Sequence, residues 1–152
     1  MKMLCLNCEA IHEVTVKNEY REYEIKKITV VGKITAYICS YCGNEIYNKD
    51  TEVCNDIIFF DEYKKKLNLL TSKEIISIRN SYNLSQATFS KILGFGLKTI
   101  TRYENGAIQD STHDNLIRLS AIKANLKLLW DNNKYKLTDY ENLNISQSVL
   151  NK

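Results

Sequence analysis

Residues 84–106 read LSQATFSKILGFGLKTITRYENG, and this stretch decides the fold of the second half of the chain. Ser85 is a favoured helix-capping residue and precedes a helix predicted over residues 86–93. Gly94 is the expected left-handed stop of that helix. A further helix is predicted over residues 97–105, again ending at a glycine. Two short helices joined by a tight glycine turn are typical of a helix-turn-helix.

Helices on both sides are predicted to complete an all-α domain of four to five helices. Thr71 and Glu74 have the spacing of a capping box and open the helix that ends before Asn83. Asp110 or Ser111 caps the helix that follows residue 106. The predicted core-facing residues are Ile75, Ile78, Tyr82, Phe89, Ile92, Leu93, Leu97, Ile100, Tyr103 or Glu104, Leu116, Leu119, Ile122, Leu126 and Trp130.

The helix over residues 97–105 carries the cations expected to meet DNA. In a helix-turn-helix the second helix of the motif lies in the major groove, with its N-terminal residues at the base edges. Lys98 and Arg102 are four residues apart, so they share a helix face, and both can donate to guanine or to phosphate. Gln86 opens the preceding helix, where it is placed to meet the DNA backbone. The candidate DNA-binding residues are Gln86, Lys98, Thr99, Thr101 and Arg102.

The first half of the chain is marked by two C-x-x-C pairs, Cys5-Leu6-Asn7-Cys8 and Cys39-Ser40-Tyr41-Cys42. Each pair supplies two thiolates from one tight turn, and four thiolates complete the tetrahedral shell of one Zn²⁺. Such a site has no open position for a catalytic water, so the sequence predicts a structural zinc. The alternatives are ordinary buried cysteines and a thioredoxin-like redox pair.

The segment between the cysteine pairs is rich in Ile, Val, Thr and Tyr, with stretches of period two that predict strands of a small meander. We expect one turn at Asn18 and Glu19 and a second at Gly32 and Lys33. Gly43 suits a knuckle turn, because glycine tolerates positive φ. His12 is a further candidate ligand, although a half-exposed strand residue is the preferred interpretation.

A helix with a mixed apolar pattern is predicted over residues 50–67, and two features of it need an interpretation. Cys54 has no cysteine partner and is expected to be a small buried apolar residue. The run Lys64-Lys65-Lys66 suits a solvated helix C-terminus, where cations meet the negative end of the helix dipole. A phosphate-binding patch is the alternative for that run.

Composition limits the classes of protein to which the chain can belong. It has 152 residues, 44% apolar residues and ten tyrosines, which excludes a disordered tail protein. It contains no run of 18 apolar residues and no signal-peptide pattern at its start, so we expect a cytoplasmic protein without a membrane partner. In that reducing compartment, paired cysteines favour metal binding over disulfides.

Charge separates the two halves of the chain. Residues 1–66 contain 10 basic and 11 acidic residues, whereas residues 67–152 contain 11 and 7. Four thiolates with one Zn²⁺ carry −2, which takes the first half from −1 to −3 and leaves the second half at +4. The second half is therefore the candidate for a polyanionic partner.

The predicted fold class is α+β, with three segments. Residues 1–66 form a small zinc-bound, β-rich domain with a trailing helix, and residues 67–130 form the helix-turn-helix domain. Residues 131–152 are a polar C-terminal tail with a faint apolar pattern at Leu137, Leu143, Ile145 and Val149. This tail is expected either to extend a dimer surface or to be disordered.

Together these motifs resemble a known family. Leu84-Ser85-Gln86, with the stretch from Thr99 to Gly106, resembles the Xre/Cro-type helix-turn-helix. Two zinc-type C-x-x-C pairs followed by this module are similar to the MqsA-type antitoxins with their YgiT-type zinc finger. The resemblance covers about residues 1–130. Lys98 departs from it, because the family has a base-reading asparagine there, whereas Arg102 matches the family's DNA-reading arginine.

The resemblance implies a bacterial type II antitoxin that represses its own transcription. Its N-terminal zinc domain, with ligands at Cys5, Cys8, Cys39 and Cys42, would neutralise a toxin, commonly a ribonuclease. Its C-terminal domain would dimerise and bind an operator palindrome in double-stranded DNA. The alternatives are a zinc-containing phage or bacterial regulator without a toxin, and a thiol oxidoreductase; the expectation is that the protein is not an enzyme.

Overall fold

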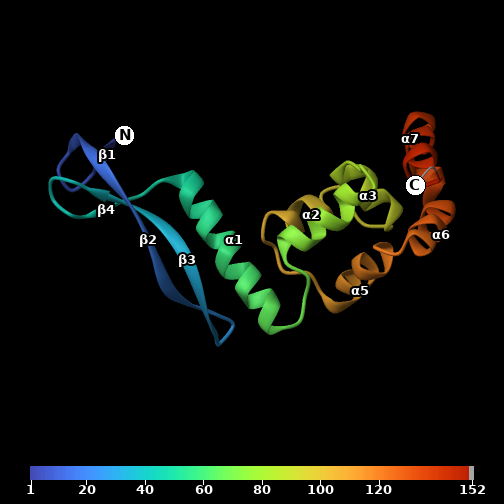
Figure 1. The fold of residues 1–152 in the computed structure, drawn as a ribbon, viewed down its shortest axis with the longest axis horizontal. Helices are drawn as coiled ribbons and strands as arrows, with labels where there is room; N and C mark the ends of the chain where they lie inside the picture. Colours follow the sequence, from blue (N-terminus) through green and yellow to red (C-terminus); the bar gives the residue numbers. More distant parts are fainter. Residues whose placement is uncertain (151–152) are drawn as a thin grey trace. The chain divides into compact units, whose positions relative to one another are not determined.

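The computed structural model describes the backbone of residues 1–150 and the side chains up to Gln147. The chain separates into two compact units, Met1–Tyr63 and Lys64–Lys152 (Figure 1). The first unit contains an antiparallel sheet and the second contains helices, which confirms the predicted α+β class. Within the described residues, no helix is both long and apolar enough to cross a bilayer.

The sheet of the first unit has four antiparallel strands in the order β1-β2-β3-β4. Their bounds are β1 (Lys2–Cys5), β2 (Ala10–Ile25), β3 (Ile28–Cys39) and β4 (Glu45–Ile46). The turns expected at residues 18–19 and 32–33 are wrong, because β2 and β3 run through them as one long hairpin. The hairpin turns instead at Lys26 and Lys27, which have φ of 47° and 67°. Two-residue hairpin turns are usually marked by Asn-Gly or Asp-Gly, so the Lys26-Lys27 dipeptide did not indicate a turn.

Gly32 serves helix packing instead of a turn. The helix α1 (Lys49–Lys66) lies against the hairpin, as Figure 1 shows. A Cβ on Gly32 would be 2.9 Å from Cγ2 of Ile58 and 3.0 Å from the Phe59 ring. Phe59 also stacks on Tyr23 of β2, with ring centroids 5.2 Å apart. The glycine therefore lets α1 approach the strand closely.

Asn55 of α1 closes part of the free edge of β3. The Thr35 N–H donates to Asn55 Oδ1 at 3.0 Å, and Asn55 Nδ2 donates to the Thr35 carbonyl at 2.9 Å. The amide thus replaces a neighbouring strand at this point, since β4 pairs only with residues 37–38 of β3. Asn55 is buried and Cys54 is exposed, so the prediction of a buried Cys54 is wrong. One residue is about 100° of helix rotation, which turns the thiol away from the packed face.

The second unit is built from helices, and the predicted caps are present. Thr71 and Glu74 form the capping box of the first helix, and the side chains of Ser85 and Asp110 each accept a backbone N–H. The elements are α2 (Ser72–Ser81), α3 (Gln86–Ile92), α4 (Thr99–Glu104), α5 (Ser111–Ser120), α6 (Lys123–Asn133), the 3₁₀ turn η1 (Lys134–Lys136) and α7 (Asp139–Leu150). Gly94 and Gly106 end α3 and α4 with φ of 73° and 98°.

Most of the predicted core residues are buried, with Ile78 and Leu116 partly buried against the core. Three are wrong: Leu97, Leu119 and Ile122 are exposed by 59%, 51% and 57%. Leu97 precedes α4, which begins only at Thr99. The helix expected over residues 111–130 is interrupted, because Ile122 has extended backbone angles.

At this interruption, side chains donate hydrogen bonds to backbone carbonyls at the end of α5. The Tyr82 hydroxyl donates to the Ala121 carbonyl at 2.8 Å, and Asn125 Nδ2 donates to the Leu119 carbonyl at 3.1 Å. These bonds stabilise the end of α5, where the helical bonding pattern stops. The helix break is therefore stabilised by contacts distant in sequence, which a local periodicity cannot reveal.

The C-terminal segment packs on the second unit. Leu137 and Ile145 are buried, whereas Leu143 is exposed and the side chain of Val149 lies outside the described residues. Trp130 Nε1 donates to Asn142 Oδ1 at 2.8 Å. Residues 134–150 are thus ordered helix and turn, and the expectation of a disordered tail does not hold for them.

Lys64 is wholly buried at the end of α1, so the interpretation of a solvated helix end fails for this residue. Its ammonium donates to Ser72 Oγ at 3.0 Å and to the Tyr103 carbonyl at 3.3 Å. Lys65 and Lys66 are exposed, as expected for the end of a helix.

Candidate metal centre and nucleic-acid interface

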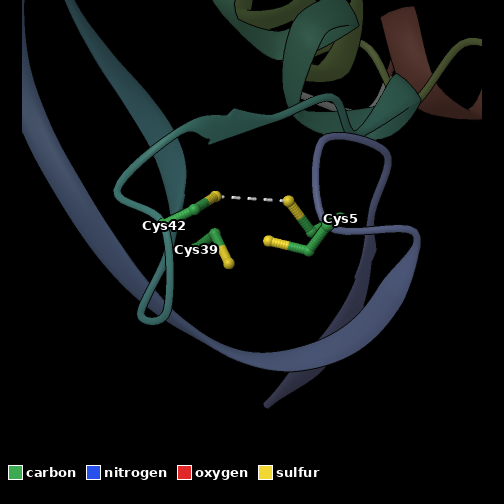
Figure 2. A group of neighbouring side chains, drawn as sticks. Cys5, Cys39 and Cys42 are labelled. Atoms are coloured by element: carbon green, nitrogen blue, oxygen red, sulfur yellow. Dashed lines mark hydrogen bonds between the residues drawn. The ribbon is translucent and has the colours of Figure 1, made fainter.

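Four cysteines gather at one end of the sheet. The Sγ atoms of Cys5, Cys8, Cys39 and Cys42 all lie within 4.8 Å of one another. The sulfurs of Cys5 and Cys42 are 3.6 Å apart, and Figure 2 shows the labelled side chains converging from two separate turns. The antiparallel pairing β1-β2-β3 brings these turns together, although the pairs are far apart in sequence.

The two turns share one backbone feature. The residue after each second cysteine has positive φ: 53° at Glu9, which follows Cys8, and 75° at Gly43, which follows Cys42. The Gly43 N–H also donates to the Cys39 carbonyl at 2.9 Å. The positive φ predicted for Gly43 is confirmed, and Glu9 adopts the same conformation without the help of glycine.

The cluster fits one metal ion with a tetrahedral thiolate shell. At a Zn–S distance of about 2.3 Å, tetrahedral sulfurs would be about 3.8 Å apart, which is close to the separation of Cys5 and Cys42. Cys5 and Cys39 are buried beside Ile46, so the site has an apolar backing. This donor set suits Zn²⁺ and, with four sulfurs, leaves no ligand position for a reactant.

The thiols of Cys8 and Cys42 differ in pKa. The Asn44 backbone N–H and the neighbouring Cys8 lower the pKa of Cys42 to about 6. The hydrogen bond that the Cys8 S–H donates to Cys42, followed by burial, raises the pKa of Cys8 to about 12. The Cys42 thiolate therefore forms more easily than the Cys8 thiolate when no metal is bound.

His12 is not part of the cluster. Its ring stacks on Tyr41, with centroids 4.9 Å apart and planes inclined by 7°. The preferred interpretation of His12 as a strand residue agrees with its position in β2, opposite Met3 of β1.

Two of the five candidate DNA-binding residues present free charge. Lys98 and Arg102 are exposed, and the Arg102 N–H bonds to the Lys98 carbonyl at 3.0 Å, so the two lie one helical turn apart. No carboxylate among the described side chains forms an ion pair with either cation. Arg79 and Arg118, by contrast, are bound to Glu104 and Asp114. Lys98, at the N-cap of α4, and Arg102, within α4, are therefore available to an anion outside the chain.

The other three candidates are half-buried, and two of them belong to an internal network. Gln86 Nε2 donates to Glu104 Oε2 at 2.6 Å, and the Thr101 hydroxyl donates to Gln86 Oε1 at 2.9 Å. Arg79 completes the network through both oxygens of Glu104. Gln86 thus fixes α3 against α4, and Thr99 lies at the first position of α4.

An apolar patch that sequence reasoning missed lies between α5 and α6. Leu119, Ile122 and Leu128 are more than half exposed, and a groove of about 160 Å³ runs beside them. The groove is lined by Leu116, Leu119, Asn125, Leu128 and Leu129. In the sequence, Leu119 and Ile122 belong to an apolar pattern that predicts a buried helix face. The helix break at Ile122 leaves both side chains exposed instead.

The open edge of β2 was also missed. β1 pairs with β2 only at residues 10–13, so on that side no strand pairs with residues 15–25 in the described part of the chain. Val16 and Tyr20 of this strand are exposed by 54% and 73%. The sequence predicted strands here, but the misplaced turns concealed the long hairpin and its edge.

The comparisons with known proteins agree with this pairing of a cysteine cluster and a helical unit. A family model described as the antitoxin component of a bacterial toxin-antitoxin system, MqsA, matches residues 1–129. The chain therefore belongs to the MqsA antitoxin family. A comparison with curated protein sequences gave no match.

Proposed function

We propose that this antitoxin is a zinc-stapled, cytoplasmic repressor that binds its own operator as a homodimer and neutralises a toxin with its N-terminal unit. The observation that carries the DNA-binding part is a pair of exposed cations without ion-pair partners among the described side chains: Lys98 at the N-cap of α4 and Arg102 within that helix. The α3–α4 pair is then a helix-turn-helix, and α4 enters the major groove.

Arg102 and Lys98 have different tasks in this proposal. Arginine binds guanine bidentately, and it is the commonest specific contact in the major groove. Lysine also favours guanine or phosphate, whereas asparagine favours adenine. The operator is therefore expected to carry guanine where relatives with asparagine at the position of Lys98 read adenine. Gln86 and Thr101 hold the two helices in register, and the second N–H of Gln86 Nε2 is left to donate to the sugar-phosphate backbone.

The homodimer is proposed to form through the apolar patch between α5 and α6. A six-residue recognition helix contacts few bases, so specific binding gains from a second half-site related by two-fold symmetry. A second copy of this chain, placing its own patch on the first, would cover the exposed Leu119, Ile122 and Leu128. Leu128→Glu should then give monomers and weaken binding to a palindrome far more than binding to a half-site.

The toxin is proposed to bind along the open edge of β2. The edge of β3 is partly closed by β4 and Asn55, whereas residues 15–25 of β2 leave backbone groups available for an added strand. With zinc bound, residues 1–66 carry −3, which favours a basic partner. Val16→Lys combined with Tyr20→Lys should weaken the complex, and Val31→Lys on β3 is the matched control.

Two experiments test the proposal as a whole. Selection from a random duplex library should yield a palindrome for the purified protein, and Arg102→Ala should abolish that selection while zinc content stays at one per chain. Co-expression with the product of the neighbouring open reading frame should rescue growth and give a stable complex. Selection of DNA with no complex would favour the alternative, a zinc-containing regulator without a toxin.

A further inference from the structure

The matched part of the family ends at residue 129, yet the chain continues as ordered structure against α3. The 3₁₀ turn η1, Lys134-Tyr135-Lys136, connects α6 to α7. Lys134 and Lys136 are exposed, and Tyr135 is exposed by 77%. This Lys-Tyr-Lys turn lies beside the proposed helix-turn-helix, where contacts of Asn133 and Glu141 with α3 hold it.

The turn is fixed to the end of α3. Asn133 Nδ2 donates to the Ile92 carbonyl at 3.1 Å. The ammonium of Lys136 lies 3.8 Å from the position that a Cβ on Gly94 would take. Gly94 is the first residue of the loop that leads to Lys98 and α4. Lys136 therefore adds a cation beside the loop that presents the recognition helix.

The segment after the turn is anchored as well. Glu141 of α7 accepts Lys91 Nζ at 2.9 Å through each carboxylate oxygen and the Thr88 hydroxyl at 3.1 Å. Both partners lie on α3, so α7 and α3 hold η1 from two sides. A cation on such a support loses less conformational freedom on binding than one on a free tail.

The ammonium groups of Lys134 and Lys136 form only weak interactions with the described side chains. Lys134 is 3.8 Å from Asp131, and both side chains are about half exposed, so solvent screens this pairing. Lys136 forms no ion pair with the described carboxylates and lies 5.4 Å over the ring of Tyr135. Asp139 is exposed nearby in sequence and Glu141 is neutralised by Lys91. Lysine and tyrosine are common partners of phosphate in protein–DNA complexes.

We propose that the Lys134-Tyr135-Lys136 turn binds the sugar-phosphate backbone of the duplex that flanks each operator half-site. The inference rests on the proposed DNA binding by α4 and extends the interface beyond the part of the chain that the family covers. Because phosphate contacts carry no sequence information, the turn adds affinity and salt dependence without changing the preferred sequence.

The test compares Lys134→Gln combined with Lys136→Gln against Lys123→Gln combined with Lys127→Gln. The second pair removes the same charge from exposed positions of α6. Binding is measured by titration, over a range of salt concentrations, on the library-selected duplex with and without about one helical turn of flanking DNA. With flanks, the first pair should lower the affinity roughly tenfold and reduce the salt slope of the dimer by about 4, because each protomer loses two cations, while the control changes neither.

On the duplex without flanks, the two variants should bind alike. Equal losses for both variants on the flanked duplex would overturn the proposal, and so would an unchanged salt slope. A photo-crosslinking amino acid in place of Tyr135 provides a second test in the otherwise intact chain: it should label flanking nucleotides, and labelling confined to the palindrome overturns the proposal. Failure of the unaltered protein to select any DNA would instead contradict the proposed function itself.

Discussion

Arg79 holds Glu104 through both carboxylate oxygens, with Nε to Oε1 at 2.6 Å and Nη2 to Oε2 at 2.9 Å. Their side chains are only 13% and 3% exposed. Arg79 also donates to the Leu84 carbonyl at 2.7 Å, just before α3 begins. One arginine of α2 thus joins α4 to the start of α3, and the geometry of the proposed DNA-binding unit depends on this pair.

Removal of one partner of this pair should be costly. Glu104→Ala leaves the Arg79 guanidinium largely buried without its anion and deprives Gln86 of an acceptor, so the unfolding free energy should fall by about 3 kcal/mol. Arg79→Met combined with Glu104→Leu should cost less than Glu104→Ala alone, because no charge is left stranded. Urea denaturation of the three proteins measures the difference, and a double variant at least as unstable as the single one would contradict it.

Replacement of Lys98 by asparagine should change sequence preference more than affinity. Asparagine pairs best with adenine and lysine with guanine, so the consensus obtained by library selection should shift at one base pair of each half-site. Arg102→Ala should instead reduce specific affinity by about 1–3 kcal/mol at each of the two half-sites, so that library selection fails. Lys127→Ala, an exposed change on α6, is the control. An unchanged consensus for Lys98→Asn would refute its place at the base edges.

Metal removal should unfold only the first unit. Four thiolates hold a small sheet whose apolar core near the site is limited, and a structural zinc supplies much of the stability of such domains. Addition of a chelator should therefore abolish the β-sheet signal, while the amide resonances of α2 to α6 persist in NMR spectra. Cys39→Ser should reproduce the effect without chelator. A folded, metal-free first unit would contradict the prediction.

Acid should release α7 from α3. Partial burial raises the pKa of Glu141, but the Thr138 N–H, the Lys91 ammonium and the Thr88 hydroxyl outweigh it and lower that pKa from 4.5 to about 2. A lowered folded-state pKa gives stability that is present above pH 4.5 and is lost as the pH falls toward 2. Trp130 fluorescence, which senses the contact with Asn142, should change over this window. Glu141→Gln should weaken docking at neutral pH and remove that pH dependence.

Local chemistry made much of the fold predictable. The capping residues Thr71, Ser85 and Asp110 and the stop at Gly94 act within a few residues of themselves, so their sequence signals survive in the structure. The cluster of the two cysteine pairs could also be predicted, because zinc binding restricts the type and spacing of its ligands.

The wrong predictions share a different cause. Gly32 was assigned to a turn, but its role is set by Ile58 and Phe59, which are distant in sequence. Cys54 was placed in the core because it is apolar, while Asn55 occupies the buried position through its bonds to the Thr35 backbone. These roles depend on which strand edge a helix meets, and the periodicity of a single segment does not contain that information.

The open edge of β2 has a consequence for the solubility of the protein. An uncovered strand edge is a template on which any extended segment can add, including the same strand of another copy. Two copies that pair along the full length of β2 would cover each other's edge, whereas pairing in a shifted register would leave part of each edge open to a further copy. We therefore expect the free chain to be most prone to aggregation when its concentration exceeds that of the partner that covers this edge.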